Sequence, residues 1–137
     1  MRPRFAAVIY LALTAVVVAF QLALAAGAPW GELTMGGAYP GRLPPRMRGV
    51  AVASAALLTG MAGVVAARAG LALPRWRRPA HRLIWGVVAY AVLGVALNAA
   101  TPSARERVLW LPVCIALAVC ALVVARSPAA QDGSPAG

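Results

Sequence analysis

The chain has 137 residues, of which 62% are hydrophobic and only 12% are charged, and its formal net charge is +10. An ordinary soluble domain has about 45–50% apolar and about 25% charged residues. The length allows one domain, and the composition excludes an ordinary soluble one because too little polar surface is available to face water. Lipid is therefore expected to surround most of the protein.

All thirteen basic residues are arginines, and they stand in short clusters between hydrophobic stretches. A basic excess can indicate nucleic-acid binding, but no nucleic-acid motif or aromatic platform for bases accompanies these clusters. We therefore expect no nucleic acid among the partners.

The first hydrophobic stretch, residues 5–26, contains no charge. At about 1.5 Å per residue, a helix of this length crosses the roughly 30 Å hydrocarbon core of a bilayer. Arg2 and Arg4 in front of it also fit a cleavable signal peptide, whose apolar core usually runs about 7–15 residues. The greater length here favours retention as a membrane span, and cleavage stays the alternative.

Three further stretches predict membrane spans at residues 50–72, 83–100 and 108–125. Arg68 interrupts the second and is expected to reach the headgroups from the helix end. Pro112 is expected in the first turn of the last helix, where its missing N–H costs least. The predicted fold is all-α, an integral membrane antiparallel bundle of four transmembrane helices in one domain of residues 1–125. The polar tail, residues 126–137, is expected to be disordered.

The arginines also predict an orientation in the cell membrane. One side of the predicted bundle would carry eight arginines and the other five: Arg2, Arg4, Arg68, Arg75, Arg77, Arg78, Arg82 and Arg126 against Arg42, Arg46, Arg48, Arg105 and Arg107. Because cytoplasmic loops are enriched in positive charge, both termini are predicted to be cytoplasmic.

The loop of residues 27–49, on the predicted outer side, is long for so small a protein. Its glycines allow tight turns and its prolines stiffen it, while Trp30 and Tyr39 give it apolar surface. We interpret it as an ordered flap over the outer end of the bundle. The alternative is a connector whose aromatic residues only anchor it to headgroups.

Polar residues within or beside the spans gather toward the same side. Gln21, Glu32, Asn98 and Glu106 form a candidate outer polar pocket beneath the flap. In the alternative, Glu106 pairs with Arg105 or Arg107 in a solvated turn, which would contribute little to stability.

No residue pattern indicates catalysis, a cofactor or a metal. Cys114 and Cys120 are six residues apart on one predicted helix, too far for a disulfide, and are interpreted as small apolar core residues. The single histidine, His81, stands among arginines with no other metal-binding residue nearby.

On the third span, Gly86, Tyr90, Gly94 and Asn98 recur every four residues and predict a packing face toward the bundle, with a homodimer contact as the alternative.

The segments APWG…GG…LPPRMR after the first span, and Asn98 followed by SARERVLWLPV, resemble a widespread family of small four-span bacterial membrane proteins. The resemblance covers most of residues 5–125. That family has no assigned biochemical activity, so the resemblance implies no catalytic residue. It implies that the flap and the segment of residues 98–112 form one unit.

The leading functional hypothesis is a multi-pass membrane protein without catalytic activity: an accessory subunit, a scaffold or a lipid-interacting component. Membrane lipids are the expected partners, and another membrane protein or a second copy of this chain is the alternative. The cluster Arg75, Arg77, Arg78 and Arg82 is a candidate contact for anionic lipid headgroups. Two further hypotheses are a small transporter or channel with its polar mouth at the outer pocket, and an enzyme acting on a lipid or isoprenoid at the interface.

Overall fold

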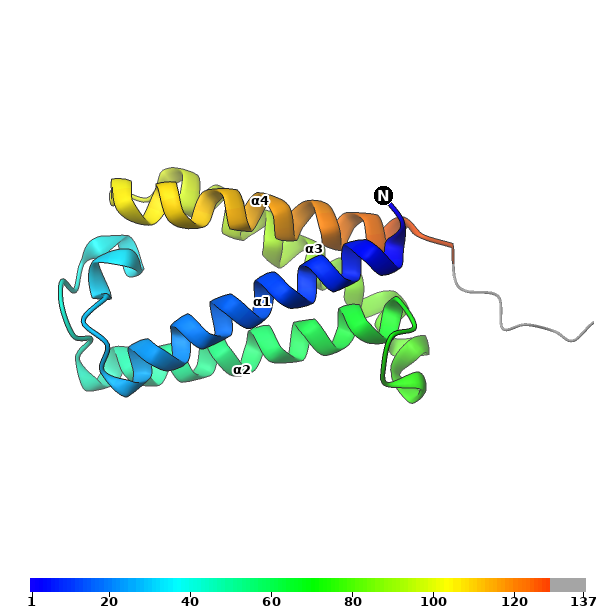
Figure 1. Ribbon diagram of the computed structural model, residues 1–137, viewed down its shortest axis with the longest axis horizontal. Coiled ribbons are helices and arrows are strands. Elements are labelled where there is room, and N and C mark those ends of the chain that lie inside the picture. Colours follow the sequence, from blue (N-terminus) through cyan, green and yellow to red (C-terminus); the bar gives the residue numbers. More distant parts are fainter. Residues whose placement is uncertain (129–137) are drawn as a thin grey trace, which may run out of the picture.

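The computed structural model describes residues 1–128, and within them four long helices form a bundle (Figure 1). They are α1 (Pro3–Ala26), α2 (Pro45–Arg68), α3 (Arg77–Ala100) and α4 (Ala104–Arg126). Each is long and apolar enough to cross a membrane, and successive helices run in opposite directions (Figure 1). The predicted all-α bundle of four apolar helices is therefore confirmed. Of the tail expected to be disordered, residues 129–137 lie outside the described residues, whereas Arg126 ends α4.

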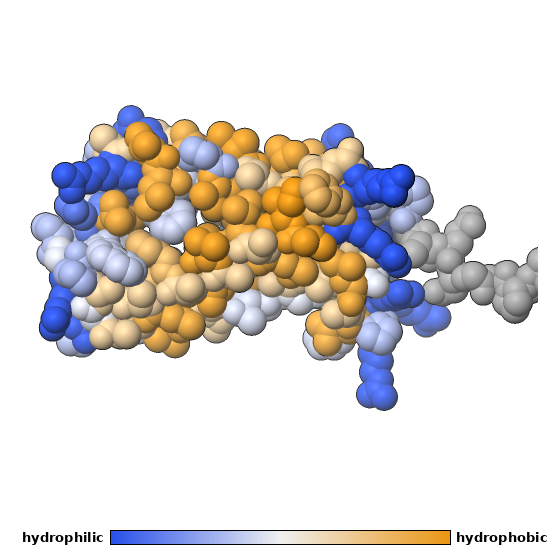
Figure 2. Space-filling model, in the orientation of Figure 1, coloured by the Kyte–Doolittle hydropathy of each residue, from blue (hydrophilic) through white to orange (hydrophobic). Residues whose placement is uncertain are grey.

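The helices are arranged in a ring. α1 packs against α2 and α4, and α3 packs against α4 and α2, with the α2–α3 pair in the least extensive contact of the four. The middle of the surface is apolar, and hydrophilic residues gather at its two ends (Figure 2). We call the end with residues 27–44 and 101–103 the flap end, and the end with residues 69–76 and both ends of the described chain the terminal end (Figure 1).

The helix boundaries differ from the predicted spans at several points. α2 begins at Pro45 and α3 at Arg77, five and six residues before their predicted spans. α2 ends at Arg68 and does not continue to residue 72, because Gly70 and Leu73 adopt positive φ values of 70° and 52° and turn the chain into the short helix η3 (Pro74–Trp76). α4 begins at Ala104, four residues before its hydrophobic run. Pro112 therefore lies well inside α4, not in its first turn, and Glu106 belongs to the helix itself.

The main hydrophobic core occupies the terminal half of the bundle. Ala6, Ala7 and Ala121 are fully buried there, together with Ile84 and Val124. Since lipid tails are as apolar as the helices, association in a membrane depends on close packing between small residues. The alanines of α1 and α4 supply this contact. Cys120 lies in the same core, and both cysteines are free, as expected.

The predicted packing face of α3 meets the bundle in its second half but not in its first. Ile84, Val87 and Ala91 are its buried residues, whereas Gly86 is exposed and a Cβ placed on it would meet nothing within 4 Å. In the first half of α3 these larger side chains, and not Gly86, therefore face the other helices. Gly94 and Asn98, further along, are half-buried.

Arginines meet the C-terminal end of every long helix, where unpaired carbonyl groups give the helix dipole its negative end. The most buried is Arg68, which was expected to reach the headgroups but is only 8% exposed. It donates hydrogen bonds to the carbonyl oxygens of Ala125 and Ser127 at the end of α4. The others are Arg48 beside Gly27 after α1, Arg77 beside Gly70 after α2, and Arg107, which donates to the carbonyl oxygen of Thr101 after α3.

Candidate functional site

Residues 27–44 fold into an ordered flap. Within it the N–H of Gly31 donates to the carbonyl oxygen of Gly41 at 2.8 Å, which closes the loop on itself. A Cβ on Gly31 would overlap the carbonyl oxygen of Tyr39, so only glycine fits this position. Leu43 is buried with Leu24 of α1 and anchors the end of the flap. These contacts agree with the predicted ordered flap.

Backbone groups of the flap bond to side chains around the start of α4. The indole N–H of Trp110 donates to the carbonyl oxygen of Leu33 at 2.8 Å, and the hydroxyl of Ser103 donates to that of Glu32 at 3.1 Å. Phe20 of α1 lies between two indoles, stacked on Trp30 at 6.0 Å and edge-on to Trp110 at 4.7 Å between ring centroids. The flap and the first turns of α4 thus form one packed unit.

Glu106 is held in place by both its backbone and its carboxylate. Its N–H donates to the hydroxyl of Ser103, the N-cap of α4, at 3.2 Å. Its Oε2 accepts hydrogen bonds from the N–H of Gly36 at 2.8 Å and from the hydroxyl of Thr101 at 2.9 Å. A carboxylate in the first turn also faces the positive end of the helix dipole. The Glu106 side chain is therefore fixed beneath the flap rather than free in a solvated turn.

A cavity of about 250 Å³ lies beneath the flap, between the four helices. Polar groups line it from every side: Gln21 from α1, Ser54 from α2, Tyr90 and Asn98 from α3, Glu106 from α4 and Thr34 from the flap. Tyr10 and Leu117 line it as well and also belong to the main core, so the cavity ends where that core begins.

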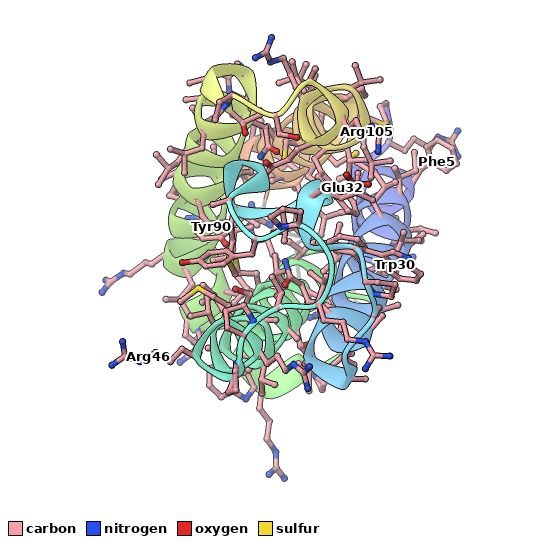
Figure 3. The ribbon with its side chains drawn as sticks, turned by 90° about the vertical axis from the view of Figure 1, so that its left-hand side faces the viewer. Phe5, Trp30, Glu32, Arg46, Tyr90 and Arg105 are labelled. Carbon is pink, nitrogen blue, oxygen red and sulfur yellow. The ribbon has the colours of Figure 1, made fainter. Side chains whose placement is uncertain are left out.

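Three of the four residues predicted for an outer polar pocket meet at this cavity. Gln21, Asn98 and Glu106 line it, and Glu32 does not. The Glu32 side chain is 48% exposed on the outside of the flap, where it pairs with Arg105 at 2.8 Å (Figure 3). The backbone of η1 (Gly31–Leu33) turns this side chain outward while its carbonyl groups face α4.

The Asn98 side chain donates one hydrogen bond within α3 and one to α4. Its Nδ2 donates to the carbonyl oxygen of Gly94 at 2.8 Å and to the Sγ of Cys114 at 3.4 Å. Both amide hydrogens are thereby used, and within residues 1–128 no hydrogen bond reaches the amide oxygen.

Sequence reasoning missed two features of this site. Leu93 and Leu97 look like ordinary lipid-facing residues, yet both line the cavity while remaining 54% and 61% exposed. Tyr90 was expected between helices, but it lies partly exposed at the rim, on the opposite side of the bundle from Trp30 (Figure 3). The only sequence signal was the spacing of Tyr90, Gly94 and Asn98 along one side of the helix.

The predicted lipid-contact arginines lie far from the cavity, at the terminal end. Arg75 belongs to η3, and Arg77, Arg78 and Arg82 belong to the first turns of α3. All four are exposed, and Trp76 among them is exposed as well. An exposed Trp beside arginines is typical of the membrane interface.

The fold and this cavity define a multi-pass helical membrane protein with a flap-covered site at one end. Within residues 1–128, no group of three or more metal-binding side chains is gathered. The chain matches no protein-family model, no curated protein and no solved structure. The resemblance to small four-span membrane proteins therefore remains a prediction.

Proposed function

We propose that this protein is a lipid-interacting membrane protein without catalytic activity, and that the flap-covered cavity receives part of an amphiphile from the bilayer. The observation that carries this proposal is the position of Leu93 and Leu97, which line the cavity and are more than half exposed on the lipid-facing side of α3. Their exposure supports a lateral opening of the cavity toward lipid.

The packing of the helices supports a lateral opening. α2 and α3 have the least extensive contact of the neighbouring pairs. Ser54 and Leu58 of α2 and Tyr90 and Leu97 of α3 all line the cavity. A molecule that arrives from the bilayer would meet apolar side chains first and polar groups beneath the flap afterwards. That order matches an amphiphile that enters headgroup first.

The cavity volume also favours binding of only part of a molecule. Sites for drug-sized ligands usually measure about 300–1,000 Å³, and this cavity, at about 250 Å³, is smaller. A polar head and the beginning of a chain fit, and the rest of the chain would stay in the bilayer. A channel would need a path onward to the terminal end, where the main core is packed.

We further propose that the flap end faces outward and both termini face the cytoplasm, because the terminal end has eight arginines and the flap end five. The exposed cluster of Arg75, Arg77, Arg78 and Arg82 would then contact anionic headgroups of the inner leaflet. The difference in arginine number between the two ends supports this orientation without reference to the cavity.

The test is photo-cross-linking in nanodiscs with a lipid that has a diazirine in its acyl chain, followed by mapping of the modified residues. We expect adducts at Leu97 and in the neighbouring cavity wall. Gly94→Leu should abolish them, because Gly94 lines the cavity and its added side chain would point toward Cys114.

The matched control is Gly86→Leu, on the same helix, because a Cβ there meets nothing within 4 Å and lies outside the cavity. This variant should keep the adducts. Size-exclusion chromatography and circular dichroism would verify that both variants are folded. Adducts spread evenly over all exposed helix faces, and unchanged by Gly94→Leu, would contradict binding in the cavity.

A further inference from the structure

The free hydrogen-bonding groups of the cavity indicate which kind of head it accepts. Glu106 Oε2 already has two donors, Gly36 and Thr101, and within residues 1–128 no hydrogen bond reaches its Oε1. Asn98 likewise uses its amide hydrogens on Gly94 and Cys114 and keeps its amide oxygen as an acceptor. Both residues line the cavity, so its wall includes two residues with an acceptor oxygen to spare, one of them a carboxylate.

No arginine of the described chain lines the cavity to balance that charge. The two arginines beside Glu106 in sequence are used elsewhere. Arg105 pairs with Glu32 on the outer surface, and Arg107 donates to the carbonyl oxygen of Thr101 at the end of α3. A carboxylate in a half-buried, lipid-flanked site without a counter-ion is costly, and a ligand cation would relieve that cost.

The same arrangement discriminates against anionic heads. A phosphate or sulfate beside Glu106 would place two negative charges together in a poorly solvated site, where their repulsion is stronger than in water. A hydroxyl head could donate one neutral hydrogen bond, which contributes less binding free energy than the charge-assisted hydrogen bond of a cation. An alkylammonium head has three donors and a positive charge, and so matches both acceptors.

We propose that the cavity selects a single-chain amphiphile with a protonated amine head, which donates to Glu106 Oε1 and to the amide oxygen of Asn98 while its chain leaves past Leu93 and Leu97. This assignment rests on the proposed function, since it names the ligand class of the same cavity. The role of the flap is to hold Glu106 in place, because the N–H of Gly36 fixes the other carboxylate oxygen.

The experiment compares three probes of equal chain length, dodecylammonium, dodecanol and dodecyl sulfate, on the full chain in nanodiscs of neutral phosphatidylcholine. Binding is measured by competition with the diazirine lipid at Leu97. We expect dodecylammonium to bind at least about tenfold more tightly than dodecanol, the ratio expected for one charge-assisted hydrogen bond, and dodecyl sulfate to bind most weakly.

Two variants distinguish the effect of the Glu106 charge on ligand preference from an effect on the fold of the flap. Glu106→Gln keeps the shape and one acceptor oxygen for Gly36 and Thr101, so the flap should stay in place while the preference for dodecylammonium over dodecanol disappears. Glu32→Gln removes a carboxylate from the same end of the bundle but outside the cavity, and should leave the preference unchanged.

The possible results distinguish the two proposals. If Glu106→Gln binds dodecylammonium as tightly as the unmodified protein does, or if dodecyl sulfate competes equally well, the ligand class is wrong although the cavity still binds amphiphiles. If none of the three probes competes and the diazirine lipid leaves no adduct in the cavity, the proposed function itself fails, and the ligand class with it.

Discussion

Arg68, the last residue of α2, donates a hydrogen bond to the carbonyl oxygen of Ser127, the residue that follows α4. The same guanidinium nitrogen lies 3.5 Å from the carbonyl oxygen of Ala125. The side chain is 8% exposed, so it stays inside the bundle instead of extending to the membrane surface. Residues 59 positions apart are thereby joined at the terminal end, where residues of all four helices form the main core.

Replacing Arg68 by Met should lower the free energy of unfolding by about 1–3 kcal/mol, the usual range for hydrogen bonds to a charged group together with the loss of a cation at a helix C-terminus. Methionine has a similar length and leaves no unpaired charge behind. Thermal unfolding in detergent micelles, followed by far-UV circular dichroism, measures the change. Arg78→Met, at an exposed position of the same end, is the control and should unfold like the original protein. Equal destabilisation by both variants would show that overall charge, and not the contact with α4, is responsible.

The flap depends on glycine at position 31, where a Cβ would overlap the carbonyl oxygen of Tyr39 and lie 2.7 Å from that of Gly41. Gly31→Ala should therefore open the loop and expose the cavity. A single cysteine at Thr34, which lines the cavity, should react faster with a small polar maleimide in this variant, in a Cys114→Ala/Cys120→Ala background. Gly49→Ala is the matched control, since nothing lies within 4 Å of its added Cβ. Unchanged reactivity in Gly31→Ala would contradict a closed flap.

The sequence predicted the four helices well because each rests on a long hydrophobic run, and the bilayer fixes how long such a run must be. It predicted helix ends poorly, since a helix continues beyond its hydrophobic run wherever its first turn can enter the headgroup region. Glu106 shows the consequence. The apolar run begins at residue 108, which places this carboxylate in a loop. α4 instead begins at Ala104 with Ser103 as its cap, so Glu106 lines the predicted pocket from the helix itself.

Other parts of the site could not be predicted from a single sequence because they depend on three-dimensional packing. Glu32 and Glu106 look alike as outer acidic residues, yet the turn of η1 directs one outward to Arg105 and the flap fixes the other inward. Likewise, the first half of α3 turns Ile84 and Val87, and not Gly86, toward the other helices. Hydrophobic pattern alone does not distinguish a residue that faces lipid from one, such as Leu97, that faces both lipid and a cavity.

The hydrogen bond from Trp110 to the carbonyl oxygen of Leu33 should hold the flap on α4. Trp110→Phe removes the donor but keeps an aromatic ring beside Phe20, and should cost about 1 kcal/mol of stability, as is usual for one hydrogen bond. Hydrogen–deuterium exchange should then be faster at residues 31–37 and unchanged in the middle of α1. Trp85→Phe serves as the control, because Trp85 is half exposed on the outside of α3 and distant in sequence from the flap contacts. Equal exchange in the flap of both variants would mean that this hydrogen bond does not hold it.

The distribution of arginines makes the orientation of the whole bundle testable. Replacing Arg75, Arg77, Arg78 and Arg82 by Gln would leave four arginines at the terminal end against five at the flap end. Because the excess of positive charge sets the orientation of small membrane proteins, the variant should insert in both orientations. A single cysteine at Tyr39, again in the Cys114→Ala/Cys120→Ala background, reports the fraction that is accessible to an impermeant maleimide in intact cells.

With all thirteen arginines present, we expect complete labelling of the cysteine in Tyr39→Cys. In the variant with four arginines replaced by Gln, we expect partial labelling. The control replaces Arg42, Arg46 and Arg105 by Gln, which removes positive charge from the flap end and keeps Arg48 and Arg107, whose side chains lie against helix ends. It should label completely, since the charge difference between the ends increases. Complete labelling in the fourfold variant would show that arginine balance does not determine the orientation. Absence of labelling in the chain with all its arginines would place the flap end in the cytoplasm, and the cavity would then open to the inner leaflet.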